Sequence, residues 1–495
     1  MMSATVIISL LTALFIYIAV GLLLGRHTRS VADMLPLIFN RQARVATSSE
    51  FSSSTVATTI SLATVIMAFF ELAQKEGIWL LWTVVTTSTG LLLVRLFAKK
   101  IWNRISIYDH RPTLHEFLGT EYKSEPLRYV GAVCTSLGFL CAFAVELTVG
   151  TKFFAALVPG VPGWTVILVL TVVAFIYTAM GGFRAVIITD RIQMVSIWLL
   201  LVSLPLFYLY FIVTQGGWSE NFANIPEGIL DFSYRPGLYA FLLGILFINV
   251  PTFISDMSIW QRIAGAQEDK TVSTGLLRSV FSSAATWGLF TILACLSFMI
   301  IKPQPDTNPL LAVVHVIGTT TGPLALIILF FTVLGLYGAM LSTASTQLIA
   351  VSHTVYADVF SRIREHLLSE RVESRKELYI SRTILIVAAV LSTILVQLLE
   401  KAGLSITDLV FAVYGPQLAL CPLVITALLF KRQQLSNLSP WAALAVTAGF
   451  ITGWGSAVYG GLTNNSNWVF LSPVLSLVVS SAVLLAGYTV DKFGK

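Results

Sequence analysis

Thirteen apolar stretches of about 20 residues follow one another along this 495-residue sequence, and they constrain its fold more than any other feature. A helix of that length crosses the roughly 30 Å hydrocarbon core of a bilayer. Because lipid offers the backbone no hydrogen-bond partners, a spanning segment must be a helix or part of a closed barrel. Barrel strands would alternate in polarity over about ten residues, and these stretches do not. We therefore expect an all-α polytopic membrane protein.

The spans are expected at 5–25, 51–73, 77–98, 128–157, 163–181, 185–214, 237–259, 272–301, 323–352, 381–400, 405–430, 439–460 and 469–490. An odd number of spans places the two termini on opposite sides of the membrane. The uncharged N-terminus is expected outside and the lysine-bearing C-terminus inside. Arg26 follows the first stretch directly, and no basic segment precedes it, so this stretch is predicted to be a retained helix rather than a signal peptide.

The placement of charge supports this topology. Only 11% of the residues are charged, against roughly 25% in soluble domains. Most of the 31 Lys and Arg residues fall in alternate loops, such as 26–44, 99–104 and 361–377. This asymmetry is typical of an inserted protein, which keeps its basic loops in the cytoplasm. It also argues against a nucleic-acid partner. We predict a multi-pass plasma membrane protein (inner membrane in a Gram-negative bacterium) whose partners include membrane lipid and which can act as a monomer.

Two spans carry irregularities that a simple membrane anchor would not need. In span 237–259, Pro251 removes a backbone hydrogen bond near Asn249 and Asp256, and span 51–73 contains a hydroxyl-rich stretch from Ser52 to Ser61. Secondary transporters place their binding sites at broken helices in corresponding positions of two repeats. Each of these spans is the first of five, which suits an inverted repeat. A proline kink and helix-packing hydroxyls explain the same residues equally well.

Four motifs, in order along the chain, resemble those of the sodium:solute symporter family, which contains proline, sugar and sialic acid symporters. They are Gly181-Gly182-Phe183-Arg184 with the residues up to Gln193, Trp260-Gln261-Arg262, Ala339 to Leu348, and Tyr414-Gly415-Pro416. The resemblance implies a leucine-transporter-like 5+5 inverted repeat. Its parts would be a first helix and loop (1–50), the first repeat (51–214), an external loop (215–236), the second repeat (237–430) and two C-terminal helices (431–495).

The resemblance also implies a first sodium site, whose Na+ would bind oxygen atoms of the second and ninth spans. The matching residues are Ala57, Ile60, Ala339, Ser342 and Thr343. Ala57 and Ile60 would supply main-chain carbonyls, and Ser342 and Thr343 would supply hydroxyls. Oxygen ligands suit a hard cation. Span 51–73 lacks the family's glycine at the expected break, so its Ser/Thr run would have to permit the unwinding.

Some family members have a second sodium site. Its residues would be Asp190, Ser345 and Thr346, together with the shared Ser342. The three hydroxyls are spaced i, i+3 and i+4, which places them on one helical face. The alternative is that Asp190 forms an ion pair with Arg184 or Arg191 and binds no ion.

Ionisable residues at membrane depth are functional candidates because burying them is costly. Glu146 and Asp256 are such residues, and by position four more side chains match the central cavity of relatives. The predicted solute-binding residues are therefore Thr59, Thr64, Glu146, Asn249, Thr252 and Asp256. A structural role for either carboxylate, bonded to neighbouring groups, is the alternative. A cavity carboxylate would favour an amine or a polyhydroxylated solute over a simple anion.

We conclude from the sequence that this chain is a sodium-coupled symporter for a small polar organic solute, working by alternating access. A proton-coupled symporter using Glu146 is one alternative, and a symporter-like sensor with a separate signalling partner is another. An enzyme is not expected, because the sequence contains no nucleotide-binding glycine motif, metal-ligand spacing or nucleophile elbow. His110 and His115 are interpreted as ordinary polar loop residues, and the four cysteines as buried and unpaired.

Overall fold

The computed structural model describes residues 2–37, 45–303, 307–360, 375–402 and 406–493. Helices build this described part, and its single isolated β-bridge joins Val45 to Ala266. Arg41, Arg44 and the charged segment 361–374, on which part of the predicted charge asymmetry depends, lie outside the described residues.

The first half of the chain contains the helices α1 (Met2–Gly25), α2 (Val31–Met34), α3 (Ser48–Thr59), α4 (Ala68–Glu76), α5 (Trp82–Ile105), α6 (Leu114–Tyr122), α7 (Glu125–Leu157), α8 (Gly163–Thr214) and α9 (Gly217–Ala223). The second half contains α10 (Leu238–Ser255), α11 (Met257–Gly265), α12 (Asp269–Leu296), α13 (Pro309–Thr319), α14 (Pro323–Thr354), α16 (Arg375–Ala402), α17 (Ile406–Tyr414), α18 (Cys421–Leu429), α19 (Arg432–Ser436), α20 (Ser439–Leu462) and α21 (Ser466–Phe493).

The all-α membrane architecture is confirmed. Within the described residues, eleven helical segments are long and apolar enough to cross a membrane. Two of them, Leu62–Ile105 and Gly163–Thr214, have 44 and 52 residues, about twice the length that one crossing requires. Gly163–Thr214 holds two predicted spans, and Leu62–Ile105 holds span 77–98 and the second half of span 51–73, whose first half is α3, so all thirteen predicted spans have a helical counterpart.

The long helix α8 divides into two spans at Gly182. The backbone of Gly182 has φ 61° and ψ −157°, a conformation open to glycine but strained for other residues. A Cβ atom there would also lie 2.6 Å from the carbonyl oxygen of Met34. The glycine pair of the first motif is thus the corner between the fifth and sixth spans.

The two irregular spans are both broken, although one break does not lie where proline suggested. In the second span, α3 ends at Thr59 and helix resumes as a π-helix, Leu62–Met67, that continues into α4. In the seventh span, α10 runs through Pro251 and ends at Ser255, and α11 starts at Met257. The seventh span is therefore irregular as expected, but Pro251 itself lies within α10. Asp256, with an extended backbone (φ −81°, ψ 116°), separates the two halves.

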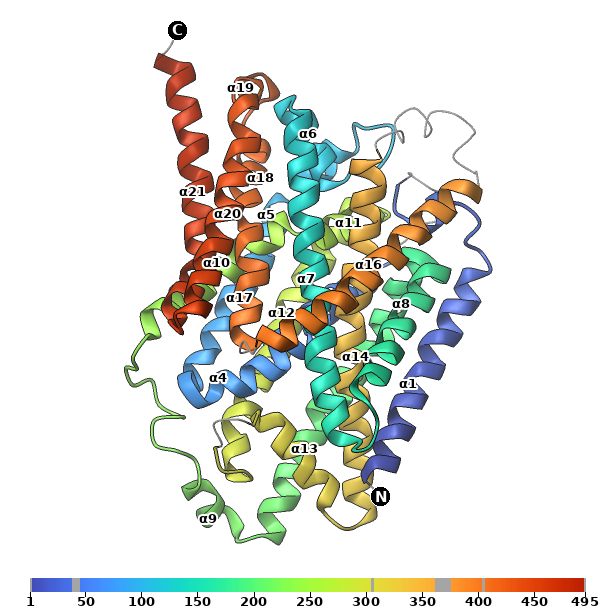
Figure 1. The fold of residues 1–495 in the computed structure, drawn as a ribbon, viewed down its shortest axis with the longest axis vertical. Coiled ribbons are helices and arrows are strands. Elements are labelled where there is room, and N and C mark those ends of the chain that lie inside the picture. Colours follow the sequence, from blue (N-terminus) through green and yellow to red (C-terminus); the bar gives the residue numbers. More distant parts are fainter. Residues whose placement is uncertain (1, 38–44, 304–306, 361–374, 403–405, 494–495) are drawn as a thin grey trace.

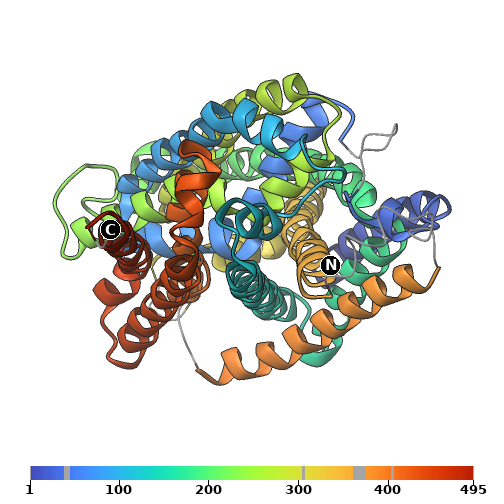
Figure 2. The ribbon, with the colours of Figure 1, turned by 90° about the horizontal axis from the view of Figure 1, so that it is seen from above.

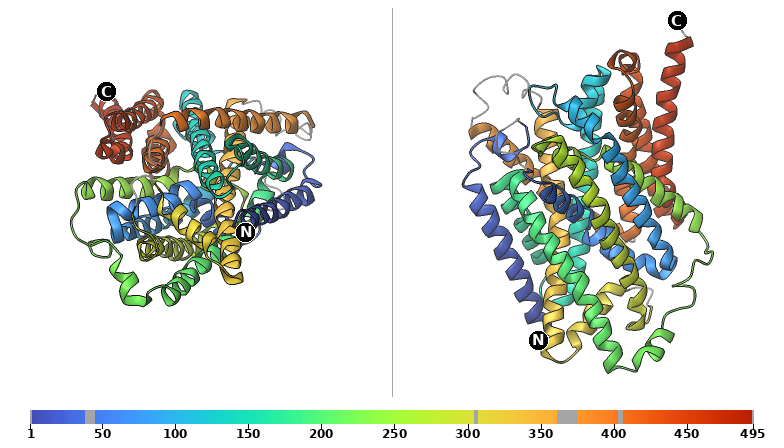
Figure 3. Two further views of the ribbon diagram at one scale, coloured as in Figure 1. Left: turned by 60° about the horizontal axis from the view of Figure 1, so that its bottom comes forward. Right: turned by 180° about the vertical axis from the view of Figure 1, so that it is seen from behind.

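The helices pack as one bundle whose two ends are distinct. Figure 1 places the start of α1 and the end of α21 at opposite ends of the molecule, as an odd number of spans requires. Seen from above, α1 lies on one side and α20 and α21 on the other, with α14 between them, and α16 runs along the lower edge of the view (Figure 2). The turned views in Figure 3 keep α9 and α13 at the end where α1 begins. Helix α13 was not predicted.

Candidate functional site

The break in the second span is held by a carboxylate from a different helix. The Ser61 hydroxyl accepts a hydrogen bond from the Thr64 amide at 2.8 Å and donates one to Glu146 Oε1. Glu146 Oε2 accepts from the Ala63 amide at 3.4 Å. Glu146 belongs to α7 and is completely buried. Free amides at a helix start attract negative charge, so Glu146 closes the start of the second half-helix.

The five residues of the predicted first sodium site meet where α3 ends against α14. Ser342 Oγ donates to the carbonyls of Ala57 and Ala339, both at 2.8 Å. Thr343 Oγ1 donates to the carbonyls of Thr58 at 3.2 Å and Ala339 at 3.3 Å. Ile60 is the residue at which α3 stops, with φ −98° and ψ 78°.

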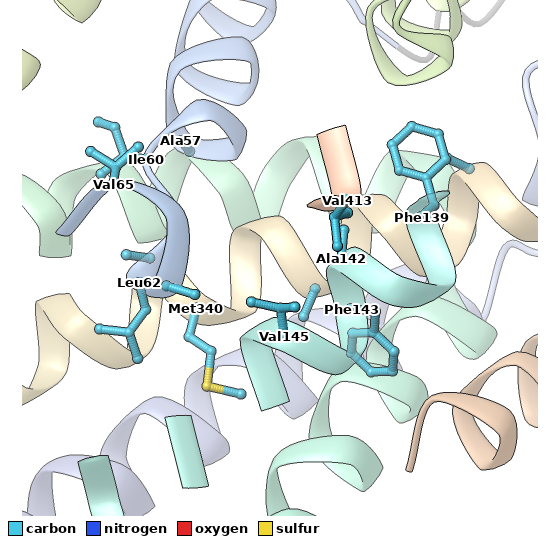
Figure 4. Packing of buried hydrophobic residues seen from close by; sticks show 14 of the residues in the cluster. Ala57, Ile60, Leu62, Val65, Phe139, Ala142, Phe143, Val145, Met340 and Val413 are labelled. Atoms are coloured by element: carbon cyan, nitrogen blue, oxygen red, sulfur yellow. The ribbon is translucent and has the colours of Figure 1, made fainter. Parts of the chain in front are cut away.

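This donor set has the chemistry that sodium requires. Carbonyl and hydroxyl oxygens are the ligands of hard cations, and each hydroxyl that donates a hydrogen bond keeps lone pairs on its oxygen. Figure 4 shows Ala57 and Ile60 on the last turn of α3 and Leu62 and Val65 just beyond the break, with Met340 of α14 and Val145 of α7 beside them. The apolar surroundings would shield a bound ion from water.

Two of the four residues of the predicted second sodium site, Asp190 and Thr346, contact an arginine that the sequence analysis had used only as part of a motif. Asp190 Oδ2 accepts from the Ser54 hydroxyl and, at 3.3 Å, from Arg262 Nη2. Arg262 Nη2 also donates to Thr346 Oγ1 at 3.1 Å. Asp190 and Arg262 are both completely buried, and Asp190 Oδ1 is a buried atom without a partner. Ser345 instead donates to the Ser342 carbonyl at 3.2 Å.

The suggested ion pairs of Asp190 with Arg184 or Arg191 were wrong. Arg184 forms two bonds to Glu50, at 2.6 and 3.0 Å, and Arg191 lies 3.5 Å from the same carboxylate. Glu50 was not considered from the sequence. Asp190 has its arginine from α11, which comes after the second break.

A pocket of about 140 Å³ lies between the two broken spans and α14. Five of the six predicted solute-binding residues line it: Thr59, Thr64, Asn249, Thr252 and Asp256. The sixth, Glu146, is not in the lining, because its carboxylate is at the break. Thr343 and Thr346, from the two predicted sodium sites, form part of the pocket wall.

Sequence reasoning missed several residues of this pocket. Trp287 and Phe69 pack edge to face, with ring centroids 5.4 Å apart. Gln347 donates from Nε2 to the Tyr414 hydroxyl at 3.2 Å. Gln347 and Tyr414 both lie within the family motifs, so their polar side chains at membrane depth could have identified them as candidate pocket residues. Trp287 carried no such signal, since tryptophan is common in apolar helices.

The interpretation of His115 as an ordinary loop residue was wrong. His115 is completely buried in α6; its Nδ1 lies 3.2 Å from Asp358 Oδ2 and its Nε2 lies 2.9 Å from Thr135 Oγ1. Asp358 also accepts from Arg128 Nε at 3.0 Å and from Thr113 at 2.7 Å. These bonds tie α6 and α7 to the segment after α14.

Comparisons with known proteins agree with this architecture. The model of the "Sodium:solute symporter family" matches residues 39–436. A sodium/pantothenate symporter of Haemophilus influenzae is 27% identical over 122 residues, which are 24% of this chain and 25% of that relative, so the match spans a quarter of the relative's length.

Solved structures of similar fold cover almost the whole chain. A Na+-coupled sialic acid symporter in a substrate-bound outward-open state superposes with a TM-score of 0.75 at 18% identity, over 99% of this chain and 98% of that one. A nucleobase-cation-symport-1 family transporter with bromovinylhydantoin bound gives 0.57 at 12% identity, over 93% and 96%. At these identities the likeness concerns the fold, which is leucine-transporter-like.

The matched region contains both broken spans and all the predicted site residues. No enzyme family is implied by any of these similarities. By its family match and its fold, this chain belongs to the sodium:solute symporter family and is a secondary active, sodium-coupled membrane transporter.

Proposed function

We propose that this protein imports a small organic solute together with sodium, that the ion binds at Ala57, Ile60, Ala339, Ser342 and Thr343, and that the solute binds in the pocket beside them. One observation carries the proposal: Thr343 of α14 donates to the Thr58 carbonyl in the last turn of α3 and also lines the pocket. An ion that draws α3 and α14 together therefore reshapes a wall of the solute pocket. A coupling free energy between two sites requires such a shared element.

Sodium binding to the purified protein tests this proposal before the solute is known. Binding to the folded state raises the melting temperature as sodium replaces potassium at constant ionic strength. Ser342→Ala and Thr343→Ala should each weaken apparent sodium affinity about tenfold, because each removes one ligand. Thr332→Ala is the matched control, since it removes a buried hydroxyl of the same helix away from the break. Equal sodium responses in all four proteins would contradict the proposed ion site.

A second sodium ion is a separate part of the proposal, at Asp190, Ser342, Ser345 and Thr346. One observation supports it: Asp190 Oδ1 is buried and unpartnered, although Oδ2 of the same carboxylate is bonded. A cation could bind this free oxygen.

We place the protein in the plasma membrane with its N-terminus outside and its C-terminus in the cytoplasm. The opposite ends of α1 and α21 support opposite sides, and the basic loops support the direction. With an impermeant reagent, a tag at the N-terminus should be labelled in intact cells, and a tag at the C-terminus should be labelled only after the cells are opened. Labelling of both tags in intact cells would contradict the topology.

Proton coupling through Glu146 is the second candidate. It is favoured by one observation: Glu146 is fully buried, and its carboxylate accepts hydrogen bonds from two uncharged groups, the Ser61 hydroxyl and the Ala63 amide. A melting temperature indifferent to sodium, together with uptake driven by a pH gradient alone, would move the proposal to Glu146.

A further inference from the structure

The charge of the pocket wall limits the solutes it can hold. Among the residues that line it in the described structure there is no Lys, Arg or His, and Asp256 is the one ionisable acid. Asp256 is already engaged, because its Oδ1 accepts the Ser258 amide at 2.6 Å and caps α11. An anionic solute would meet no cationic side chain in this wall, which is costly, and the proposed sodium across Thr343 already has its own oxygen ligands. A cationic solute would face the proposed sodium across Thr343.

Three buried polar atoms in the wall have no partner. They are Gln347 Oε1, Trp287 Nε1 and Thr55 Oγ1, on side chains that are 2%, 7% and 0% exposed. Buried polar atoms are nearly always hydrogen-bonded, so these three are available to a ligand. The glutamine oxygen can only accept and the indole nitrogen can only donate. A matching solute needs at least one N–H or O–H donor and one acceptor.

The size and walls of the pocket indicate the body of the solute. The cavity measures about 140 Å³, and an engineered apolar cavity of about 150 Å³ in another protein holds one benzene molecule. Phe69, Trp287 and Phe411 supply aromatic surface, which packs well against a flat ring. Ile245 and Ile248 add aliphatic surface. A polyhydroxylated solute would bring many donors and acceptors to a wall that is largely apolar, and burying them there is costly.

We propose that the pocket binds an uncharged solute about the size of one six-membered ring that carries a carboxamide-like group, with its N–H on Gln347 and its C=O on Trp287. This inference rests on the proposed function, since it names the class of solute for that same site. It replaces the broader expectation of a small polar solute, or of an amine or polyol, with a mostly apolar body and one polar group.

Three isosteric probes separate the charge classes: benzamide, benzoate and benzamidinium, which carry charges of zero, minus one and plus one. Each is titrated into the full-length purified protein in sodium, with binding measured by calorimetry and melting temperature. Benzamide should bind at least tenfold more tightly than either ion. Benzoate or benzamidinium binding as tightly as benzamide, or no benzamide binding at all, would overturn the proposal.

Two substitutions test whether the probe sits in this pocket. Trp287→Phe keeps the ring and removes the N–H, and Gln347→Met keeps the length and removes the amide. Each should weaken benzamide binding about three- to tenfold, the effect of one hydrogen bond. Trp218→Phe and Gln433→Met, on exposed side chains of α9 and α19, should change nothing. Unchanged affinity in both pocket variants would overturn the assignment.

Failure of this inference and failure of the proposed function look different. If the solute class is wrong, sodium still raises the melting temperature of the wild type and Ser342→Ala still weakens that response. If the proposed function is wrong, the sodium response itself is absent, whatever the probes do.

Discussion

The two broken spans occupy corresponding positions in the two repeats, yet the free amides at their helix starts are capped in different ways. At the first break, Ser61 caps the helix start and is itself held by Glu146, 85 residues away on α7. At the second break, Asp256 caps α11 with its own carboxylate, two residues from the amide it binds. The first break therefore depends on the packing of a third helix, whereas the second is complete within its own chain segment.

This difference suggests which break is adjustable. A displacement of α7 would release Ser61 and the Ala63 amide, and with them the turn that follows the Ala57 and Ile60 carbonyls. No equivalent movement would uncap α11. Arg262 links the two broken spans. It lies on α11, and it donates to the hydroxyl of Ser54 on α3 at 2.8 Å and to the carbonyl of the same residue at 3.4 Å. We infer that the second broken span acts as a fixed support for the first.

The largest expected effect comes from cutting that link. Arg262→Met leaves Asp190 buried without its cation, and breaking a buried ion pair costs about 3–5 kcal/mol. The Arg262→Met variant should have a clearly lower melting temperature or a much lower expression level. Arg191→Met is the control, because the Arg191 side chain is 50% exposed and such a pair is worth about 1 kcal/mol or less. Thermal unfolding in detergent measures the stability of both variants. Equal losses of stability would mean that Arg262 contributes no more than an exposed ion pair does.

The next effect separates geometry from charge at the first break. Glu146→Ala removes the acceptor of two buried donors, which should lower stability by about 2 kcal/mol. Glu146→Gln keeps an oxygen there and should cost less than about 1 kcal/mol, yet it removes a carboxylate that supports the break beside the proposed ion and should weaken sodium binding several-fold. Melting curves at graded sodium concentrations report both quantities. A Glu146→Ala protein as stable as the wild type would show that the first break is also closed locally.

The sequence predicted the fold well for a physical reason. Each span is set by its own run of apolar residues, so thirteen spans could be located one by one, and the Ser/Thr run did contain the first break. In the second irregular span the sequence analysis named Pro251 and Asp256 together, and the break lies at Asp256, whereas α10 passes through Pro251. The Asp256-Met257-Ser258 sequence, an acidic N-cap before a helix start, was the better local signal.

The site was predictable only as far as its residues act locally or follow a family motif. Four solute-pocket residues were found by position, and a fifth, Asp256, was found as an ionisable residue at membrane depth. Glu146 and Asp190 were recognised as unusual, but their partners were not, because Ser61–Glu146 and Asp190–Arg262 join residues 85 and 72 positions apart. Nothing in a local pattern specifies such pairs. They arise from the packing of α3, α7, α8 and α11.

A smaller effect concerns the second sodium ion, which would bind between the two breaks. With two ions the wild type should show a Hill coefficient for sodium between one and about two, since cooperativity is bounded by the number of sites. Asp190→Asn removes the one carboxylate ligand and should lower the coefficient towards one, while Ser342-dependent binding persists. A wild-type coefficient near one, with one charge moved per solute, would leave the Asp190–Arg262 pair with a purely structural role.

The smallest effect is expected at the second break. Asp256→Ala removes an N-cap and should cost about 1 kcal/mol, whereas Asp256→Asn should be nearly neutral because asparagine caps a helix as well as aspartate does. Both losses should be smaller than that of Glu146→Ala, since only one local hydrogen bond is at stake. Sodium affinity at the first site should be unchanged in the asparagine variant. A loss at Asp256→Ala exceeding that at Glu146→Ala would reverse the comparison, because the second break would then be the one that depends on tertiary support.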